Sequence, residues 1–189
     1  ANIDVFGYMF PRKIDPILAP ISTAIGVMGM LGLTAYAGLV VQCEPKPGDT
    51  LVVSAASGGV GQVVCQLGRL YGCRVVAIAG SDEKLEYLKT LGVDAVVSHR
   101  SPSFAEELRQ ACPDGCDIYF ENVGGAVFDG VLPLLNVHAR ISLCGLISQY
   151  GNDDGQDPRS LWRARGNAAF ERNSVLVHDL FVGNFVAEY

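Results

Sequence analysis

The sequence predicts an α/β fold built on a doubly wound parallel sheet. Short apolar runs alternate with longer helical stretches along most of the chain, which is the pattern of strands that are each joined to the next by a covering helix. The first of these runs, 51–55, passes through a glycine-rich turn directly into an apolar helix. The 189 residues also suffice for one domain with a substantial core.

Turn residues divide the chain into its elements. A turn at 45–49, with two prolines and a glycine, precedes the first strand. A second turn at 122–125 precedes a helix that is expected to run to Leu135. The expected strands are 51–55, 74–79, 95–97, 117–120, 140–145 and 174–182. The other expected helices are 32–41, 59–71, 82–91, 104–111 and 160–169.

Three helix ends carry recognisable signals. Ser81 is expected to cap the helix 82–91, whose first turn is acidic and therefore suits the helix dipole. Gly92 follows the last turn of that helix, as is typical of a C-terminal cap. Ser103 and Glu106 have the spacing of a capping box, which predicts a helix that begins there and ends at 111.

The N-terminal part of the chain has a different character. Residues 1–20 contain three prolines and are expected to be a junction segment that arrives from elsewhere, with the main domain at 21–189. No charged residue occurs between Pro16 and Cys43, a length that can span a bilayer. The prolines, glycines and hydroxyl side chains within it favour instead a helix of a water-soluble protein that is buried on most sides.

Composition and charge narrow the class of protein. The net charge of −6 and the lack of a basic stripe argue against a nucleic-acid partner. Of six cysteines, only Cys112 and Cys116 lie close together, and no Cys-x-x-Cys pair occurs. This favours buried thiols over a metal site, so no metal is expected. No secretion signal is recognisable, and a reducing cytoplasm is the expected compartment.

The most informative run is Ala-Ala-Ser-Gly-Gly-Val-Gly at 55–61. Its spacing is a variant of the dinucleotide-binding fingerprint, and it lies between a strand and a helix as that fingerprint requires. Gly58 and Gly59 are expected to let the chain turn and approach a pyrophosphate, which the helix N-terminus would hold. Gly61 is expected to let the helix pack close to the strand. An ordinary glycine-rich turn without a ligand is the alternative.

The tip of the second strand indicates which nucleotide would bind. An NAD site usually carries an acidic residue there, whereas this tip reads Ala-Ile-Ala-Gly-Ser at 77–81. A 2′-phosphate suits such a neutral tip, and Lys84 would supply a charge-assisted contact. The sequence therefore predicts NADP rather than NAD. If it does not bind the phosphate, Lys84 is a solvated helix residue.

Five blocks of sequence, in order, resemble a known family: 29–36, 55–61, 80–84, 120–125 and 144–150. The chain resembles the zinc-independent medium-chain dehydrogenase/reductases. Within them it is most similar to the double-bond reductases, which include leukotriene B4 dehydrogenase/prostaglandin reductases, plant alkenal reductases and bacterial curcumin-reductase-like proteins. The resemblance covers nearly the whole chain, and five blocks in register are more specific than the glycine motif alone.

The resemblance implies an enzyme that reduces the carbon–carbon double bond of α,β-unsaturated ketones and aldehydes with NADPH. Hydride would go to the β-carbon, and the enolate would be protonated at the α-carbon. Tyr150 matches a family tyrosine that positions the reaction or stabilises the enolate oxygen; the alternative is a loop aromatic over apolar surface. The implied cofactor-binding residues are Met30, Thr34, Ser57, Gly58, Gly59, Val60, Gly61, Gly80, Ser81, Lys84, Asn122, Cys144 and Gly145.

Within that set, the resemblance gives each group a place along the cofactor. The glycine turn would hold the pyrophosphate, and Ser81 and Lys84 the 2′-phosphate. Asn122 would contact the middle of the cofactor. The residues near the nicotinamide would be Met30, Thr34, Cys144 and Gly145.

The chain departs from the family pattern in three places. Where many relatives have tyrosine and lysine after the third strand, near the adenosine phosphate, it has His99 and Arg100. As cofactor-binding residues, His99 would stack or bond there, and Arg100 would replace the lysine charge. Leu31 replaces a usual proline. Relatives also carry a GroES-like substrate domain that precedes and follows the nucleotide domain. The chain is therefore expected to be a fragment that binds cofactor more readily than it turns over substrate.

The sequence leaves two alternative functions open and also predicts a homodimer. A non-catalytic nucleotide-binding module and a quinone oxidoreductase-like reductase are the alternatives. A zinc alcohol dehydrogenase is disfavoured because the structural-zinc cysteine cluster is missing, and a short-chain dehydrogenase because no Tyr-x-x-x-Lys pair occurs. The last strand, 174–182, is expected to be an apolar sheet edge that pairs antiparallel with its copy in a homodimer.

Overall fold

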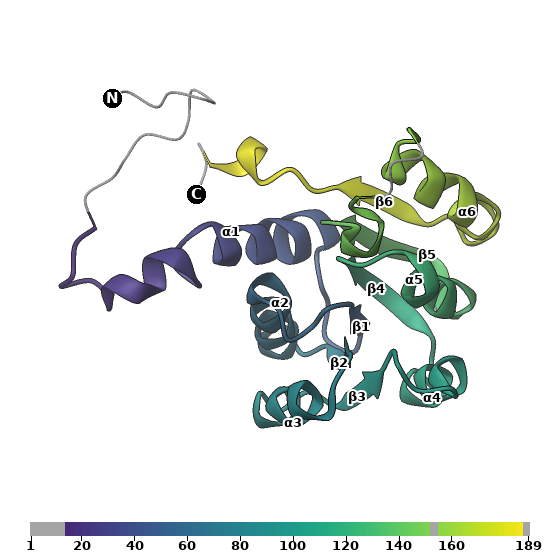
Figure 1. Ribbon diagram of the computed structural model, residues 1–189, viewed down its shortest axis with the longest axis horizontal. Coiled ribbons are helices and arrows are strands. Elements are labelled where there is room, and N and C mark those ends of the chain that lie inside the picture. Colours follow the sequence, from purple (N-terminus) through teal and green to yellow (C-terminus); the bar gives the residue numbers. More distant parts are fainter. Residues whose placement is uncertain (1–13, 152–154, 187–189) are drawn as a thin grey trace.

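The computed structural model describes residues 14–151 and 155–186. Their core is a six-stranded sheet with the order β3-β2-β1-β4-β5-β6, in which every pairing is parallel. The chain builds outward from β1 to β3 and then returns to place β4 beside β1 (Figure 1), which confirms the doubly wound fold. The strands are β1 (Thr50–Val53), β2 (Arg74–Ala79), β3 (Ala95–Ser98), β4 (Cys116–Glu121), β5 (Leu135–Leu143) and β6 (Leu176–Asp179).

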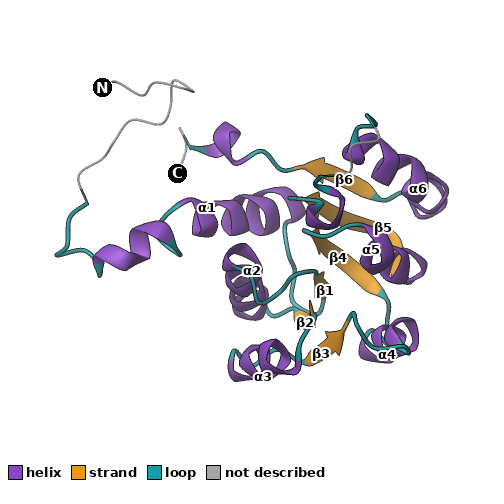
Figure 2. Ribbon diagram, viewed as in Figure 1, coloured by secondary structure: helices purple, strands orange, loops and turns teal. Residues whose placement is uncertain are grey.

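Helices connect the strands and cover both faces of the sheet, as Figure 2 shows. They are α1 (Met30–Tyr36), α2 (Gly59–Leu70), α3 (Asp82–Thr90), α4 (Phe104–Ala111), α5 (Gly125–Val131) and α6 (Pro158–Asn173). α1 continues directly into a π-helical segment, Ala37–Gln42. Short 3₁₀ helices are found at Ile21–Ile25, Leu132–Leu134, Ile147–Gln149 and Val182–Phe185.

The two faces of the sheet form two separate cores. Because side chains alternate along a strand, neighbours in β1 and β4 point to opposite faces. Val53 and Phe120 belong to the core under α1 and α2, whereas Val52 and Tyr119 belong to the core under α5 and α6. All four are fully buried, as expected for central strands covered on both sides.

The uncharged N-terminal stretch is only partly buried. Residues 1–13 of the expected junction segment lie outside the described residues. Ala35 and Leu39 are fully buried, in agreement with the expected buried helix. That expectation is wrong for the preceding part, where Ile17 is 90% and Ile25 82% exposed, because this segment extends away from the sheet before α1 begins (Figure 1). The described residues contain no helix long and apolar enough to cross a membrane.

Several expected boundaries are wrong around β5 and β6. α5 ends at Val131 rather than Leu135, because the chain tightens into a 3₁₀ turn with Pro133 near its start. β5 then begins at Leu135, not 140, and pairs with β4 through an irregularity that includes His138 at φ 63°. β6 is shorter than 174–182, because Ser174 still caps the end of α6 in a left-handed conformation and Val182 already begins a 3₁₀ helix.

The cap of α4 and the bounds of α6 also differ from expectation. The capping box at Ser103 is wrong: its hydroxyl donates to Glu107 at 2.7 Å, while Glu106 pairs with Arg109. α6 is longer than the expected 160–169 and starts at Pro158. Asp157 caps it by accepting from two backbone N–H groups, a signal that Asp followed by Pro gives at a helix start.

Candidate functional site

The residues that the sequence singles out for cofactor binding gather at one edge of the sheet. Parallel strands all end at the same edge, and folds of this kind bind ligands beyond it where the strand order reverses, here between β1 and β4. Residues 57–61 follow β1, 80–81 follow β2, 99–100 follow β3, 122 follows β4, and 144–145 follow β5. The fold therefore places five short segments, far apart in sequence, beyond neighbouring carboxyl ends.

The sharp bend after β1 is made by an alanine. Ala55 lies in the left-handed region at φ 47°, whereas Gly58 has an ordinary extended conformation at φ −72°. The expectation that Gly58 and Gly59 provide the turn is therefore wrong for Gly58, which needs no glycine for its backbone angles. β1 also ends at Val53 instead of continuing to 55, because the chain already turns there.

Gly61 packs α2 against the end of β1 as expected. A Cβ on Gly61 would lie 2.5 Å from the carbonyl oxygen of Ala55 and 2.8 Å from the α-carbon of Ala56. Both are backbone atoms, so no side-chain movement would relieve the overlap. The N-terminus of α2 is thereby held directly over the bend.

The N-terminus of α2 is open to a ligand. Its N-cap is Gly58, which is exposed and offers no side chain to cap the helix. The first backbone N–H groups of a helix carry partial positive charge and suit a phosphate. Leu31 packs against Gly59, whose Cβ position is 2.6 Å from a Leu31 methyl carbon. Leu31, which stands where relatives usually have proline, therefore helps to cover this turn.

Met30 and Thr34 lie at the start of α1, next to α2 in the fold. Met30 is half exposed, and the Thr34 hydroxyl donates to the Met30 carbonyl oxygen at 2.6 Å. The Thr34 proton is therefore already used within the helix. Both residues remain predicted cofactor contacts.

The tips of β2 and β3 meet at Gly80. A Cβ there would lie 2.6 Å from Nε2 of His99 and 3.2 Å from Nε of Arg100. His99 and Arg100 therefore crowd the tip of β2. Ser81 begins α3 without a side-chain cap, so the expected capping bond is not formed. Lys84 lies exposed in the first turn of α3.

The end of β4 holds a buried carboxylate that the sequence analysis missed. Glu121 is fully buried and accepts hydrogen bonds from Ser54, from the backbone N–H of Val123 and Gly124, and from the Trp162 indole. A glutamate that ends an apolar strand directly before a glycine turn was the available signal, because such a turn presents N–H groups back to it.

Asn122 is fixed over the end of β1. Its backbone N–H donates to the Ser54 hydroxyl and its side-chain amide donates to the Ser54 carbonyl, each at 2.8 Å. Its own carbonyl accepts from Ile147 in the next segment of the site. The turn at 122–125 is thus tied to β1 on one side and to the chain after β5 on the other.

The end of β5 brings Cys144, Gly145 and Tyr150 to the same turn. The N–H groups of Cys144 and Gly145 both donate to the Glu121 carbonyl at 3.0 Å. Burial raises the pKa of the Cys144 thiol to about 11, which keeps it neutral near pH 7. The structure therefore brings Cys144 to the site as a neutral, weakly polar wall.

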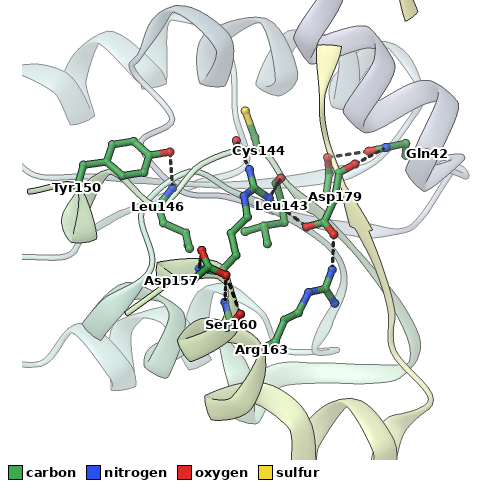
Figure 3. A network of polar contacts seen from close by, with 11 residues as sticks. Gln42, Leu143, Cys144, Leu146, Tyr150, Asp157, Ser160, Arg163 and Asp179 are labelled. Atoms are coloured by element: carbon green, nitrogen blue, oxygen red, sulfur yellow. Dashed lines mark hydrogen bonds and ion pairs between the residues drawn. The ribbon is translucent and has the colours of Figure 1, made fainter. Parts of the chain in front are cut away.

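Tyr150 folds back over this wall, as Figure 3 shows. Its hydroxyl accepts from the Leu146 N–H at 3.2 Å, and it would be 3.2 Å from a Cβ on Gly145. The side chain is 64% exposed. Tyr150 thus lies at the surface of the site with its oxygen directed toward Gly145.

Polar contacts from α6 brace the end of β5 (Figure 3). The Arg159 guanidinium donates to the carbonyl oxygens of Leu143 and Cys144 and pairs with Asp179 at 3.0 Å. Arg163 pairs with the other Asp179 carboxylate oxygen at 2.7 Å. α6 therefore links the wall of the site to the edge strand β6.

A cavity of about 390 Å³ lies elsewhere, between the segment 42–49 and residues of β4, β5 and β6. Its Arg140 is already paired with Asp49 at 2.7 Å and donates to two backbone carbonyls. Its Asp117 accepts from Thr50 and Asn136. These groups hold the strands together and lie away from the carboxyl ends of the strands.

Comparison with known proteins gives consistent matches. Residues 59–169, more than half of the chain, match the zinc-binding dehydrogenase family. The chain is 56% identical over 130 residues to an NADPH-dependent curcumin reductase of Escherichia coli (strain K12), covering 68% of this chain and 38% of that protein. It is 50% identical over 145 residues to prostaglandin reductase 1 of Mus musculus, covering 76% and 44%.

Among solved structures, CurA from Vibrio vulnificus in complex with NADPH matches with a TM-score of 0.78 and 48% identity. The match covers 88% of this chain and 51% of that one. The chain thus spans about half the length, or less, of these relatives.

Proposed function

Because the chain belongs to the zinc-binding dehydrogenase family, we propose that it forms the NADPH-binding half of a reductase for the double bond of α,β-unsaturated ketones and aldehydes. One observation carries the proposal: the carboxyl ends of the strands place an uncapped helix N-terminus, the Gly80 tip and the 122–125 turn along one edge of the sheet. The names of similar proteins, including a curcumin reductase and a 2-alkenal reductase from Nicotiana tabacum, support the substrate class.

Different residues bind different parts of the proposed cofactor. The N-terminus of α2 binds the pyrophosphate, because its N–H groups are uncapped and Gly61 allows it close to β1. Arg100, Ser81 and Lys84 hold the 2′-phosphate at the Gly80 tip, where a guanidinium gives the stronger, charge-assisted contact. His99, which lies against Gly80, would stack on or bond to the cofactor near the adenosine phosphate.

The nicotinamide half lies at the ends of β4 and β5. Asn122 and Gly145 approach it from the braced turn, Cys144 lines it as a neutral thiol, and Met30 and Thr34 close it from α1. When bound, NADPH supplies the hydride that reduces the β-carbon. The residues of this half exclude water and fix the ring.

Tyr150 is the proposed catalytic residue. Its hydroxyl accepts a hydrogen bond from the Leu146 N–H, so its own proton remains for donation to a substrate oxygen. A donor held at this place stabilises negative charge as the enolate forms. This hydrogen-bond arrangement and the position of Tyr150 beside Gly145 support the role that the family resemblance implies.

The proposal assigns no zinc to this half of the protein. Within the residues that the structure describes, no group of three or more His, Cys, Asp or Glu is placed to hold a metal ion. In this proposal the Tyr150 hydroxyl, and not a metal ion, stabilises the enolate oxygen. The thiols of the six cysteines are free, which suits the proposed cytoplasmic setting.

The proposed assembly is a homodimer through β6. This strand is an edge of the sheet, paired with β5 on one side, and Leu176 in it is 57% exposed. An exposed edge strand presents unpaired backbone groups that a second copy satisfies by antiparallel pairing.

A turnover assay tests the substrate class. The chain is incubated with NADPH and either an α,β-unsaturated ketone or its saturated counterpart, and NADPH oxidation is followed. Slow oxidation with the unsaturated ketone alone supports the proposal. Equal oxidation with both ketones contradicts the substrate class, and binding of NADPH without any oxidation favours a non-catalytic nucleotide-binding module.

A further inference from the structure

The buried carboxylate of Glu121 joins three segments at the site. We infer that Glu121 is a positioning residue: it sets the 122–125 turn against the nicotinamide half of the cofactor, and Trp162 fixes the orientation of its carboxylate. The inference rests on the proposed binding of NADPH at this edge. It assigns Glu121 no contact with the cofactor or the substrate.

The contacts of Glu121 divide between its two oxygens. Oε1 accepts from the Ser54 hydroxyl at 3.0 Å, from the Val123 N–H at 2.7 Å and from the Gly124 N–H at 3.0 Å. Oε2 accepts from the Trp162 indole N–H at 3.1 Å. One oxygen therefore holds β1 and the turn, and the other holds α6.

All four partners are neutral donors, and the carboxylate is fully buried. A buried acceptor that holds several donors at once constrains them strongly, because each donor left without it would lose a partner where water cannot replace it. Trp162 is itself almost completely buried and stacks on Phe128 at a ring-centroid distance of 4.4 Å. The packed indole therefore has little freedom to move, and it fixes the position of the carboxylate that it contacts.

The Ser54 hydroxyl links the Glu121 carboxylate to Asn122. It donates to Glu121 and accepts from the Asn122 N–H at 2.8 Å. The backbone of Glu121 extends the constraint to β5, since its carbonyl accepts from Cys144 and Gly145. A change at the carboxylate thus moves the residues proposed at the nicotinamide. The 2′-phosphate residues lie at the tips of β2 and β3, which are two and three positions away from β4 in the sheet.

This separation allows a specific test. Glu121→Gln keeps the shape but replaces one accepting oxygen by an N–H donor. In either orientation of the amide, that donor faces another donor, at Trp162 or at the turn. Calorimetry on the 189-residue chain would measure the affinity for NADPH and for adenosine 2′,5′-bisphosphate, which lacks the nicotinamide half.

We expect Glu121→Gln to bind NADPH about tenfold more weakly and adenosine 2′,5′-bisphosphate as tightly as the wild type. Adding Trp162→Phe removes the indole donor, so the Gln nitrogen can point to α6 and its oxygen to the turn. This second substitution should restore most of the lost NADPH affinity. A purely structural role predicts the opposite, because Trp162→Phe would add to the damage.

Ser142→Ala is the matched control. Ser142 is equally buried on the neighbouring strand β5 and bonds to Gln42, away from the turn. It should leave the affinity for both ligands unchanged. If Glu121→Gln does not fold, as judged by circular dichroism, Ser54→Ala replaces it, because this variant removes the hydroxyl link with little change of volume. The same selective loss of NADPH affinity is expected.

The outcomes separate the two proposals. Wild-type chain that binds neither ligand overturns the proposed function and this inference together. Wild-type binding with unchanged NADPH affinity in the variants overturns only the role of Glu121. If Glu121→Gln lowers the affinity for both ligands equally, or if adding Trp162→Phe does not restore the NADPH affinity, the effect is a general structural one. Either result also overturns the inference.

Discussion

The carbonyl oxygen of Ala55 lies 2.5 Å from the position that a Cβ on Gly61 would occupy, so the first turn of α2 rests directly on the bend after β1. Ala55 itself has φ 47°, and the bend and the glycine therefore depend on each other. The close approach sets where the N-terminus of α2 points. The phosphate site proposed there exists only while this contact is kept.

Gly61→Val is expected to destabilise the fold and abolish NADPH binding. The added side chain overlaps backbone atoms, an overpacking that costs about 1–3 kcal/mol or more. Gly58→Val is the comparison, because Gly58 has an allowed φ and its nearest contact to a Cβ is 3.1 Å. It should keep most of the stability in urea unfolding but lose NADPH. A folded Gly58→Val chain with wild-type NADPH affinity would refute the phosphate site.

Arg100→Ala and Lys84→Ala should weaken NADPH but leave NADH nearly unchanged. A charge-assisted phosphate contact is worth roughly 1.5–3 kcal/mol, or about ten- to a hundredfold in affinity. Arg100 crowds the Gly80 tip, so the larger loss is expected there. Lys89→Ala is the control, since Lys89 pairs with Glu86 at the far end of α3. Equal loss of both nucleotides in the test variants would count against a 2′-phosphate site.

Stability should fall as the pH rises above about 9. Burial raises the pKa of Cys65 from 9.0 to about 12, so the folded chain keeps a proton that the unfolded chain releases above pH 9. Ionisation then favours the unfolded state by about 1.4 kcal/mol per pH unit for one such thiol. Urea unfolding near pH 8 and near pH 10 measures the fall, which Cys65→Ala should reduce. An equal fall in the variant would show that Cys65 does not contribute.

A dimer through β6 should dissociate when its edge is charged. Leu176→Lys places a charge on the exposed edge, which disfavours strand pairing. Leu161→Lys changes a leucine that is also exposed, on α6, and should leave assembly unchanged. Sedimentation equilibrium would compare the three chains. A wild-type chain that stays monomeric at high micromolar concentration would end the dimer proposal.

Much of the fold was predictable because its signals are local. The alternation of apolar strands with covering helices predicts the parallel sheet, and the run at 55–61 predicts the strand-to-helix turn. The bounds of β5 were not predictable in the same way. They depend on its pairing with β4 across an irregularity at His138, which no pattern within the strand itself encodes.

The site was predictable in outline for the same reason. Loops at the carboxyl ends of parallel strands must converge, so motif residues in those loops come together. The supporting residues were harder to find. Ser54, Glu121 and Trp162 meet only because β1, β4 and α6 pack against one another. Likewise, the left-handed turn falls on Ala55 because tertiary packing overrides the preference for glycine at such angles.

The proposed NADPH site is tested most directly by the affinity of the wild-type 189-residue chain for NADPH and for NADH, measured side by side by nicotinamide fluorescence. We expect saturable binding of both nucleotides, with NADPH bound about ten- to a hundredfold more tightly because of the charge-assisted contacts at the Gly80 tip. Binding of neither nucleotide, or equal affinity for the two, would contradict the proposed site.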